Sequence, residues 1–403
     1  MKKIQNQEVN ENIPVDLALE LVRGLPLKQS VIEVPVSKAG GKLLADDAIA
    51  QRYTPQFDNS AMDGFLFYRN DLNRNQRTFR IVGEIRPEDN AVQKFEPGNC
   101  LRIMTGARVP DGDFFVIPVE LISAEDDSVT VNEVPDSNPI RRKGEGYKTG
   151  KTVLEKGTVM RPYEMGLLIE SGNKTCQIYK PVTIALQVTG SEISEDNNTN
   201  GPVLTGVMQT WPGVDVSIQP VLDDQPENVR ERLRALAQHF DIMITTGGIS
   251  AGRHDYILNA MLELGANVHI RKVLQKPGKP FTVTTLNNAS CFHLPGNPIS
   301  AIFTAEFYVR AFLYQKFGLN FPERSAITET KLQNSRGSRT IFAPGTIGMN
   351  QDGRLTVKSE GFMKSHLLQL YSGNDVYVRL DQETEFNPGE QVPIIPFSTT
   401  FLP

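Results

Sequence analysis

Hydrophobic runs of strand and helix character alternate between residues 181 and 318. Short runs rich in β-branched residues predict strands within 182–188, 214–221, 240–246, 267–273, 281–285 and 291–294. The spacing predicts helices over 227–239, 255–264 and 298–317, and Gly265 ends the second of them. Strands that alternate with helices predict a mainly parallel sheet with helices on both faces. This region is therefore the predicted ligand-binding α/β domain.

The pattern on either side of this region is different. Leucines and a valine before Gly24 predict an amphipathic helix near the N-terminus. Residues 79–85, 100–106, 114–122 and 128–134 form short β-rich runs with turn residues between them. From residue 326 the runs are strand-like again, and Asp352-Gly353 predicts a hairpin turn. The sequence therefore predicts β structure both before and after the α/β domain, and the last part is a small β-barrel or sandwich.

Composition and charge narrow the function classes. The 403 residues suggest two to four domains, and the net charge of -5 argues against a general binder of nucleic acid or membrane surfaces. No apolar run approaches the ~20 residues that span a bilayer. Cys100, Cys176 and Cys291 are odd in number and far apart, which is typical of a reducing cytoplasm and predicts no disulfide framework. The five histidines and three cysteines show no zinc-binding spacing.

Three glycine-bearing loops follow predicted strands of the α/β domain. They are residues 189–192, 246–250 and 294–298. In an open parallel sheet the carboxyl ends of strands bind ligands, and glycine lets backbone N–H groups approach an anion. One such loop is more often a plain connection between a strand and a helix. Three that converge on one sheet edge favour a phosphate-like ligand.

A basic segment lies between two of these loops. Arg271, Lys272, Lys276 and Lys279 fall within "RKVLQKPGKP" in an otherwise acidic chain. A solvated charged loop is the ordinary alternative for any single lysine. The prolines of the segment stiffen it, and a stiff basic loop beside glycine turns favours the binding of a polyanion.

Carboxylates lie at the ends of strands and the starts of helices in the same domain. Glu192, Asp223, Asp224 and Asp255 are the candidates, and one or two of them would hold Mg²⁺ beside a phosphate. The spacing does not say which. Asp255 is alternatively a helix cap, and Asp223 and Asp224 alternatively solvate a turn. The acids of "FDNSAMDG", residues 57–64, also read as a turn unless other evidence supports a function.

Several segments together resemble one protein family. "FDNSAMDG", "RIMTGARVP", "IRRKGE", "TTGGIS" followed by Asp255-Tyr256, "KPGKPF" and "LPGNPISA" occur in this order. The combination is highly specific, covers residues 12–400, and is least well matched in the C-terminal 80 residues. The chain resembles the molybdopterin molybdenumtransferase family of the MoeA type, which is related to the E domain of gephyrin.

The resemblance implies an architecture and an activity. It implies a multidomain α/β plus β fold, with an N-terminal linker domain at residues 1–76 and 136–178, an inserted β subdomain at 77–135, a molybdopterin-binding α/β domain at 179–325 and a C-terminal β domain at 326–403. It implies a cytoplasmic transferase of molybdenum cofactor biosynthesis. With Mg²⁺, such an enzyme inserts molybdenum from molybdate into adenylylated molybdopterin and releases AMP.

Partners and site residues also follow from the resemblance. It implies a homodimer whose cleft combines elements of both subunits, with other proteins of cofactor synthesis or acceptor proteins as further candidate partners. The residues implied for catalysis are Asp58, Thr105, Glu192, Asp223, Asp255, Lys272 and Lys276. Of these, Glu192, Asp223 and Asp255 would hold the metal. The residues implied for cofactor binding are Gly190, Gly247, Gly248, Ser250, Lys279, Pro295, Gly296, Asn297 and Ser365.

The chain departs from the family pattern at three positions. Gly146 replaces an acid of "GED", Ser191 replaces an acid of "TGDE", and Pro344 replaces the arginine of "FxRG". The leading hypothesis remains the enzyme, and these losses keep open an alternative function, a catalytically impaired paralogue that binds molybdopterin or acts as a scaffold. A third reading, a hydrolase of a nucleotide pyrophosphate, is disfavoured because the resemblance runs the full length and includes Asp58 and Thr105.

Overall fold

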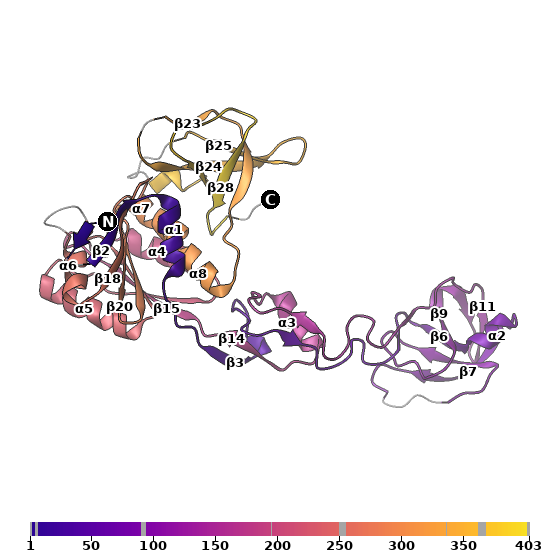
Figure 1. Ribbon diagram of the computed structural model, residues 1–403. Coiled ribbons are helices and arrows are strands. Elements are labelled where there is room, and N and C mark those ends of the chain that lie inside the picture. Colours follow the sequence, from indigo (N-terminus) through magenta and orange to yellow (C-terminus); the bar gives the residue numbers. More distant parts are fainter. Residues whose placement is uncertain are drawn as a thin grey trace. The chain divides into compact units, whose positions relative to one another are not determined.

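The chain forms two compact units, each with its own hydrophobic core (Figure 1). The computed structural model describes residues 2–4, 7–89, 94–194, 196–249, 255–335, 337–361 and 368–400. The first unit comprises Met1–Ile32, Gly41–Leu43 and Tyr179–Pro403, and the second comprises Glu33–Gly40 and Leu44–Ile178.

A mixed β-sheet is the centre of the first unit. In spatial order its strands are β1 (Lys2–Ile4), β2 (Gln7–Ile13), β18 (Asn267–Val273), β20 (Thr282–Leu286), β21 (Ala289–Leu294), β17 (Ile242–Thr246), β15 (Val182–Val188) and β16 (Val214–Ile218). The block from β21 to β16 is parallel, as predicted. β20 runs antiparallel to both of its neighbours, because the short loop Asn287-Asn288 between β20 and β21 permits only a hairpin. The sheet is therefore parallel where the glycine loops lie and mixed as a whole.

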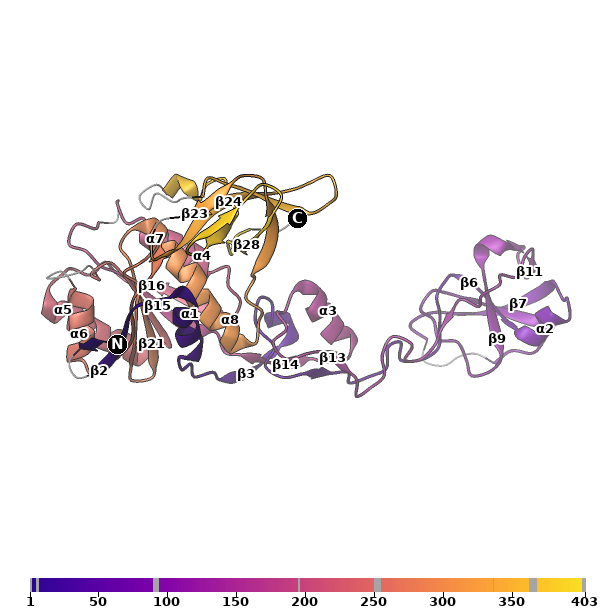
Figure 2. The ribbon, with the colours of Figure 1, turned by 45° about the horizontal axis from the view of Figure 1, so that its top comes forward.

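Helices cover both faces of this sheet (Figure 2). They are α1 (Val15–Gly24), α4 (Asn200–Met208), α5 (Pro226–His239), α6 (Tyr256–Glu263), α7 (Pro298–Thr304) and α8 (Arg310–Phe317). α5 and α6 lie on one face, where Val229, Leu233 and Leu236 of α5 pack in one core cluster with Met243 of β17. A π-helical turn, Ala305–Val309, joins α7 to α8 within the predicted long helix.

α4 is not among the elements that the sequence predicts. Gly201, Pro202 and Gly206 interrupt its helical pattern. Its buried Leu204 and Met208 nevertheless lie on one face at i and i+4. Tertiary packing against β15, β16 and α7 therefore stabilises a helix that local propensity disfavours.

The C-terminal part of the first unit is a small β-barrel. Its strands are β22 (Arg324–Thr328), β24 (Thr340–Met349), β25 (Leu355–Ser359), β26 (Val376–Leu380) and β28 (Gln391–Pro396), with β19 (Gln275–Lys276) added at the edge and β23 (Leu332–Asn334) paired with β27 (Thr384–Phe386). β24 pairs with both β25 and β26, which closes the barrel. The Asp352-Gly353 turn joins β24 to β25, as predicted.

The second unit contains a sheet of its own and three short strand pairs. The sheet strands in spatial order are β10 (Ile122–Ala124), β11 (Ser128–Val131), β7 (Thr78–Ile85), β8 (Asn99–Ile103), β6 (Gly64–Tyr68) and β9 (Phe114–Pro118). Helix α2 (Arg69–Asn73) lies between β6 and β7 in the chain, and α3 (Pro162–Glu170) comes after the last strand of the sheet. The pairs are β5 (Asn59–Ser60) with β12 (Ile140–Arg141), β4 (Ala48–Ile49) with β13 (Thr152–Leu154), and β3 (Val31–Pro35) with β14 (Thr175–Tyr179).

Two elements lie across the predicted domain boundaries. β6 precedes residue 77 but belongs to the sheet of the insert, because its apolar run "GFLFY" hydrogen-bonds β8 and β9. β2 lies in the predicted N-terminal domain but pairs in parallel with β18 of the first unit. Strand pairing, rather than position along the chain, decides where these segments belong.

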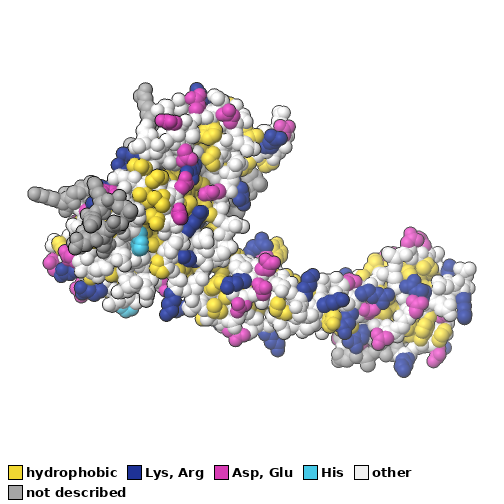
Figure 3. All heavy atoms as spheres, viewed as in Figure 1, with side chains coloured by type: hydrophobic (Ala, Val, Ile, Leu, Met, Phe, Trp, Pro, Cys, Tyr) yellow, Lys and Arg dark blue, Asp and Glu magenta, His cyan; other side chains and the backbone are white. Residues whose placement is uncertain are grey.

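On the face shown in Figure 3, the described part of the surface carries both acidic and basic side chains, and several basic ones lie close together on the second unit. The presence of both signs is in keeping with the small net charge of -5. No helix within the described residues has the length and apolar character needed to cross a lipid bilayer.

Candidate functional site

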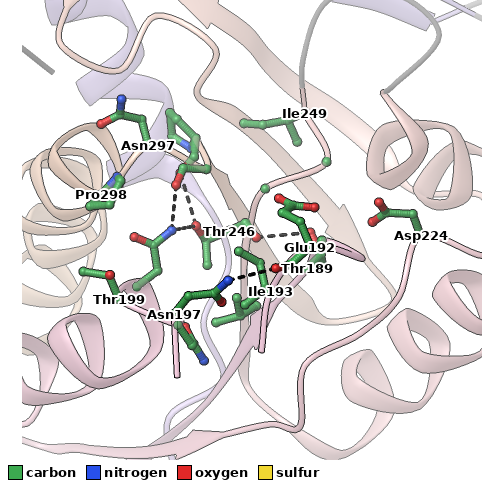
Figure 4. Close-up of a pocket in the computed structure, with 18 of the residues that line it drawn as sticks. Thr189, Glu192, Ile193, Asn197, Thr199, Asp224, Thr246, Ile249, Asn297 and Pro298 are labelled. Atoms are coloured by element: carbon green, nitrogen blue, oxygen red, sulfur yellow. Dashed lines mark hydrogen bonds between the residues drawn. The ribbon is translucent and has the colours of Figure 1, made fainter. Parts of the chain in front are cut away.

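A cavity of about 560 Å³ lies at the carboxyl ends of β15, β17 and β21 in the first unit (Figure 4). These neighbouring strands end in register, with Val188 opposite Thr246 and Thr246 opposite Leu294. The loops that follow them all contribute to the lining of the cavity. The three predicted glycine loops therefore converge on one sheet edge.

The backbones of these loops approach one another too closely for larger residues. Gly247 has φ +95°, and a Cβ there would lie 2.7 Å from the carbonyl oxygen of Thr189. Gly248 has φ +65°, and a Cβ there would lie 2.6 Å from the ring of Tyr256. A Cβ on Gly296 would lie 3.4 Å from Cα of Gly247. Glycine is thus required here by close approach, and it leaves backbone exposed to a ligand.

Amide side chains hold the loops and also offer free acceptors. Asn200 Nδ2 donates to Thr246 Oγ1 at 2.7 Å and to the Gly296 carbonyl at 2.8 Å, and Thr246 Oγ1 donates to the Pro295 carbonyl at 3.2 Å. Within the described part of the chain, the buried Oδ1 atoms of Asn200 and Asn297 have no hydrogen-bond partner. Both residues line the cavity. Buried acceptors without partners are costly, which makes these two atoms candidates for contact with a ligand donor.

Two carboxylates among the described residues line the same cavity, those of Glu192 and Asp224. Asp224 Oδ2 accepts a hydrogen bond from the Ser191 N–H at 3.3 Å, while its buried Oδ1 has no partner among the described residues. Burial raises the pKa of the Tyr256 phenol well above its usual range, and a side-chain hydrogen bond with Asp224, together with the charges of Asp224 and Glu192, raises it further. Tyr256 therefore stays protonated at neutral pH and donates to Thr189 Oγ1 at 3.3 Å.

Asp223 lies outside the described lining of the cavity, although the next residue belongs to it. Its carboxylate accepts hydrogen bonds from Asn228 Nδ2 at 3.0 Å and from the Gln225 N–H at 3.2 Å. These contacts hold the first turn of α5. Asp223 is thus tied to the start of α5, beside the turn that was its alternative place, whereas Asp224 lines the cavity.

Asp255 also lies outside the described lining. It occupies the N-cap position of α6 without a side-chain cap hydrogen bond, and Oδ2 accepts from Arg271 Nη2 at 3.2 Å. Burial raises the pKa of Asp255, and the charge of Arg271 offsets this only in part. Lys272 Nζ lies 3.4 Å from Glu11 Oε1. The predicted ligand-gripping residues Asp255 and Lys272 are therefore members of a partly buried ion-pair cluster.

The other lysines of the basic segment are not among the described residues that line the cavity. Lys276 is exposed and belongs to β19, which pairs with β24 of the barrel. Lys279 accepts a backbone hydrogen bond from Val273 through its carbonyl. Of residues 271–280, only Pro280 is among the described residues that line the cavity. The segment thus connects the central sheet to the barrel, a role that residue type alone does not reveal.

Asp58 and Thr105 lie in the second unit. Asp58 accepts from Arg142 Nη1 at 2.6 Å and from the Lys143 N–H at 2.8 Å. Burial pushes the pKa of Asp58 up, but these hydrogen bonds outweigh it and lower the pKa below its usual range. The N–H and hydroxyl of Thr105 both donate to Asp63 Oδ1, at 2.6 and 2.8 Å. A part for Asp58 and Thr105 in the chemistry stays a prediction.

Two predicted residues, Ser250 and Ser365, fall outside the described residues. Within the described ones, no group of three or more histidines, cysteines or acids is arranged to hold a metal. The predicted set of Glu192, Asp223 and Asp255 is therefore not one cluster. Glu192 lines the cavity, whereas the other two serve α5 and the Arg271 ion pair.

The remaining departures from the family pattern have local structural surroundings. A Cβ on Gly146 would lie 3.1 Å from the carbonyl oxygen of Thr54, so an acid there would meet another oxygen. Pro344 is buried in β24, and its carbonyl accepts from Ser359 Oγ at 2.6 Å. Both positions are packed against neighbouring backbone or strand residues.

Known proteins resemble the chain along its whole length. Residues 13–172 match the sequence profile of the MoeA N-terminal region (domain I and II), residues 185–315 that of the probable molybdopterin binding domain, and residues 327–397 that of the MoeA C-terminal region (domain IV). A protein of Haemophilus influenzae named molybdopterin molybdenumtransferase is 32% identical over 397 residues, covering 94% of this chain and 97% of that protein. One of the same name from Staphylococcus aureus strain COL is 29% identical over 408 residues, covering 96% of each.

Solved structures agree on the fold. The molybdopterin biosynthesis MoeA protein of Pyrococcus horikoshii OT3 has a TM-score of 0.78 at 23% identity, covering 96% of this chain and 100% of that one. The Haemophilus protein is 32% identical over nearly the whole chain, and the three consecutive profile matches all belong to the same family. The chain belongs to the MoeA family of molybdopterin molybdenumtransferases, the enzymes of molybdenum cofactor biosynthesis.

Proposed function

We propose that this chain inserts molybdenum from molybdate into adenylylated molybdopterin and releases AMP in a Mg²⁺-dependent reaction. The observation that carries the proposal is the cavity where three glycine loops meet the carboxylates of Glu192 and Asp224. Parallel strands that end in glycine loops form the usual phosphate-binding edge of an α/β sheet. Carboxylates next to a phosphate require a cation between them, which favours a metal-dependent reaction.

The residues present fit a magnesium ion. Asp224 directs a buried oxygen, Oδ1, that has no partner among the described residues, and Glu192 lines the same wall. Mg²⁺ is commonly held by one or two carboxylates together with substrate phosphates and water. We assign the metal to Glu192 and Asp224, in place of Asp223 and Asp255. When bound, the ion would neutralise phosphate charge and polarise the bond to the leaving AMP.

The rest of the cavity binds and orients the substrate in this proposal. Gly247, Gly248 and Gly296 line the cavity and carry no side chain that would cover their backbone N–H groups. The free Oδ1 atoms of Asn200 and Asn297 are acceptors for N–H or hydroxyl groups of the pterin or the nucleotide. Positioning and electrostatic stabilisation, without a side-chain nucleophile, suffice for this transfer.

We further propose that the chain works as a cytoplasmic homodimer, with other proteins of cofactor synthesis or acceptor proteins as partners. Two-fold dimers are the commonest closed assemblies. Helix α3 supports an interface because it exposes large apolar side chains, with Tyr163 82% and Ile169 56% accessible. A sedimentation experiment at micromolar concentration tests the assembly, and a species of 44.8 kDa alone would refute it.

The decisive experiment compares Asp224→Asn with Asp223→Asn. Both variants remove one negative charge with little change in volume, and an asparagine at 223 can still accept the hydrogen bonds at the start of α5. AMP release from adenylylated molybdopterin, with molybdate and Mg²⁺, should fall at least about tenfold for Asp224→Asn, or ~1.4 kcal/mol of transition-state stabilisation. Asp223→Asn should retain most of the activity.

The same assay decides between the enzyme and the impaired paralogue. Wild-type protein that binds molybdopterin but releases no AMP would overturn the proposed activity. The departures at Gly146, Ser191 and Pro344 would then be restored to Asp, Asp and Arg together, and recovery of AMP release would assign the loss to them.

A further inference from the structure

Ser191 and Asp224 hold each other through reciprocal hydrogen bonds beside the cavity. The Ser191 N–H donates to Asp224 Oδ2, and the Asp224 N–H donates to Ser191 Oγ, both at 3.3 Å. The same two loops are joined by a hydrogen bond of 3.2 Å from the Gly190 N–H to the Leu222 carbonyl. Asp224 is therefore held through Oδ2 and through a side-chain interaction with Tyr256, while its buried Oδ1 accepts no hydrogen bond within the described residues.

Two carboxylates supply the negative charge on the side of the cavity next to Ser191. Glu192 and Asp224 both line the cavity, and both charges act on Tyr256. In the described part of the chain, no third acid, histidine or cysteine joins them in a group that could hold a metal. Two carboxylates leave most of the coordination sphere of a Mg²⁺-like ion to water or to phosphate oxygens, because such ions take six oxygen ligands.

We propose that Ser191 makes cation binding in this cavity dependent on a phosphate-bearing ligand. Its N–H and hydroxyl orient Asp224, but the side chain adds no third negative charge. Without the ligand, Glu192 and Asp224 hold a divalent cation weakly, and the phosphate supplies the missing anionic oxygens. By linkage, the cation raises the affinity for the phosphate by the same factor. Ser191 thus acts through the absence of a third charge, and the inference rests on the proposed function for the identity of the cation.

The test measures Mn²⁺ binding to the full-length protein. Mn²⁺ is a hard divalent cation with the same preference for oxygen ligands, and its free concentration is read by electron paramagnetic resonance. The titration is run with and without AMP, with an AMP blank lacking protein. In wild type, AMP should lower the Kd for Mn²⁺ by about tenfold or more, a coupling of ~1.4 kcal/mol.

Variants separate charge from hydrogen bonding. Ser191→Asp should bind Mn²⁺ at least about tenfold more tightly than wild type when AMP is absent, and AMP should then have a smaller effect. Ser191→Ala adds no charge and should keep the dependence on AMP. The control Ser194→Asp places the same charge in the same loop at a residue whose N–H donates to Asn197 rather than to Asp224, and it should behave as wild type.

Two results would overturn the inference. One is a Mn²⁺ affinity of wild type that AMP leaves unchanged, and the other is a folded Ser191→Asp variant with the wild-type affinity in the absence of AMP. Fluorescence of the buried Trp211 reports whether that variant is folded, and the wild-type titration tests the inference even if it is not. Failure of the proposed function looks different, because wild type would then show Mn²⁺–AMP coupling but no AMP release in the catalytic assay.

Discussion

Gly247→Ala is the sharpest perturbation of the cavity floor. The backbone at this position has φ +95°, and left-handed backbone costs a residue with a Cβ about 1–2 kcal/mol. The new methyl group would also lie 2.7 Å from the carbonyl oxygen and 2.9 Å from Oγ1 of Thr189. Overpacking of this kind costs about 1–3 kcal/mol, so the free energy of unfolding of the first unit should fall by about 2–5 kcal/mol in total.

Gly265→Ala is the matched control. Gly265 has φ +82° at the end of α6, but a Cβ there would meet no atom within 4 Å. Its substitution should therefore cost only the backbone strain, about 1–2 kcal/mol. The difference between the two variants isolates the contact with Thr189.

Unfolding of the first unit can be followed alone. The chain has one tryptophan, Trp211, which is 3% exposed and lies in that unit. Urea titration read by its fluorescence avoids averaging over transitions that need not coincide in a chain with two units. The affinity for AMP, measured by calorimetry, should fall at least about tenfold for Gly247→Ala and change less than about twofold for Gly265→Ala. Equal losses of stability in both variants would refute the close-approach argument.

Two further predictions concern buried charges in the first unit. Burial raises the folded-state pKa of Asp255 above its ordinary 3.8 despite Arg271, so the folded state disfavours the ionised form. The variant Asp255→Asn should therefore have a thermal midpoint at pH 7 that is no lower than that of wild type. Any gain in the midpoint should shrink as the pH falls toward 3.8, because wild-type Asp255 is then protonated. Glu306 is 1% exposed; its carboxylate accepts a hydrogen bond from the Ser398 N–H at 2.7 Å, and Oε1 lies 3.9 Å from Nη1 of Arg310. Glu306→Leu leaves the buried Arg310 charge unpaired and should lower the free energy of unfolding by about 3–5 kcal/mol in the Trp211 titration. An unchanged midpoint of that titration would contradict this account.

The sequence predicts the cavity well because its signals are local. A strand that ends in "TTGG" or "LPGN" carries its own strand and turn signals. Parallel neighbours in one sheet bring their carboxyl ends to the same edge, so the convergence of Gly190, Gly247 and Gly296 follows from topology. The helix over 227–239 is predicted for a similar reason, since its apolar positions repeat at helical spacing.

Side-chain direction is what the sequence does not specify. Asp223 and Asp224 are adjacent and identical, yet one holds the start of α5 and the other lines the cavity. The difference depends on the path of the loop. That path is held by a hydrogen bond to Asp224 from Ser191, which lies in the loop after β15. The basic segment shows the same limit. Lys276 belongs to β19, which pairs with β24 at the edge of the barrel, and β24 begins only at Thr340.

A side chain that already has internal partners must lose them before it acts on a ligand. Both oxygens of Asp58 accept hydrogen bonds, from Arg142 and Lys143, and these bonds keep its carboxylate ionised. Asp58 can therefore serve as a base only if the Arg142 contact opens, and until then it acts as a fixed negative charge. Asp224 differs, because one of its oxygens is buried without a hydrogen-bond partner among the described residues; in the proposed function that oxygen would bind the cation without first losing a partner. The two acids are the same residue type and therefore differ in the availability of an acceptor atom, not in their intrinsic chemistry.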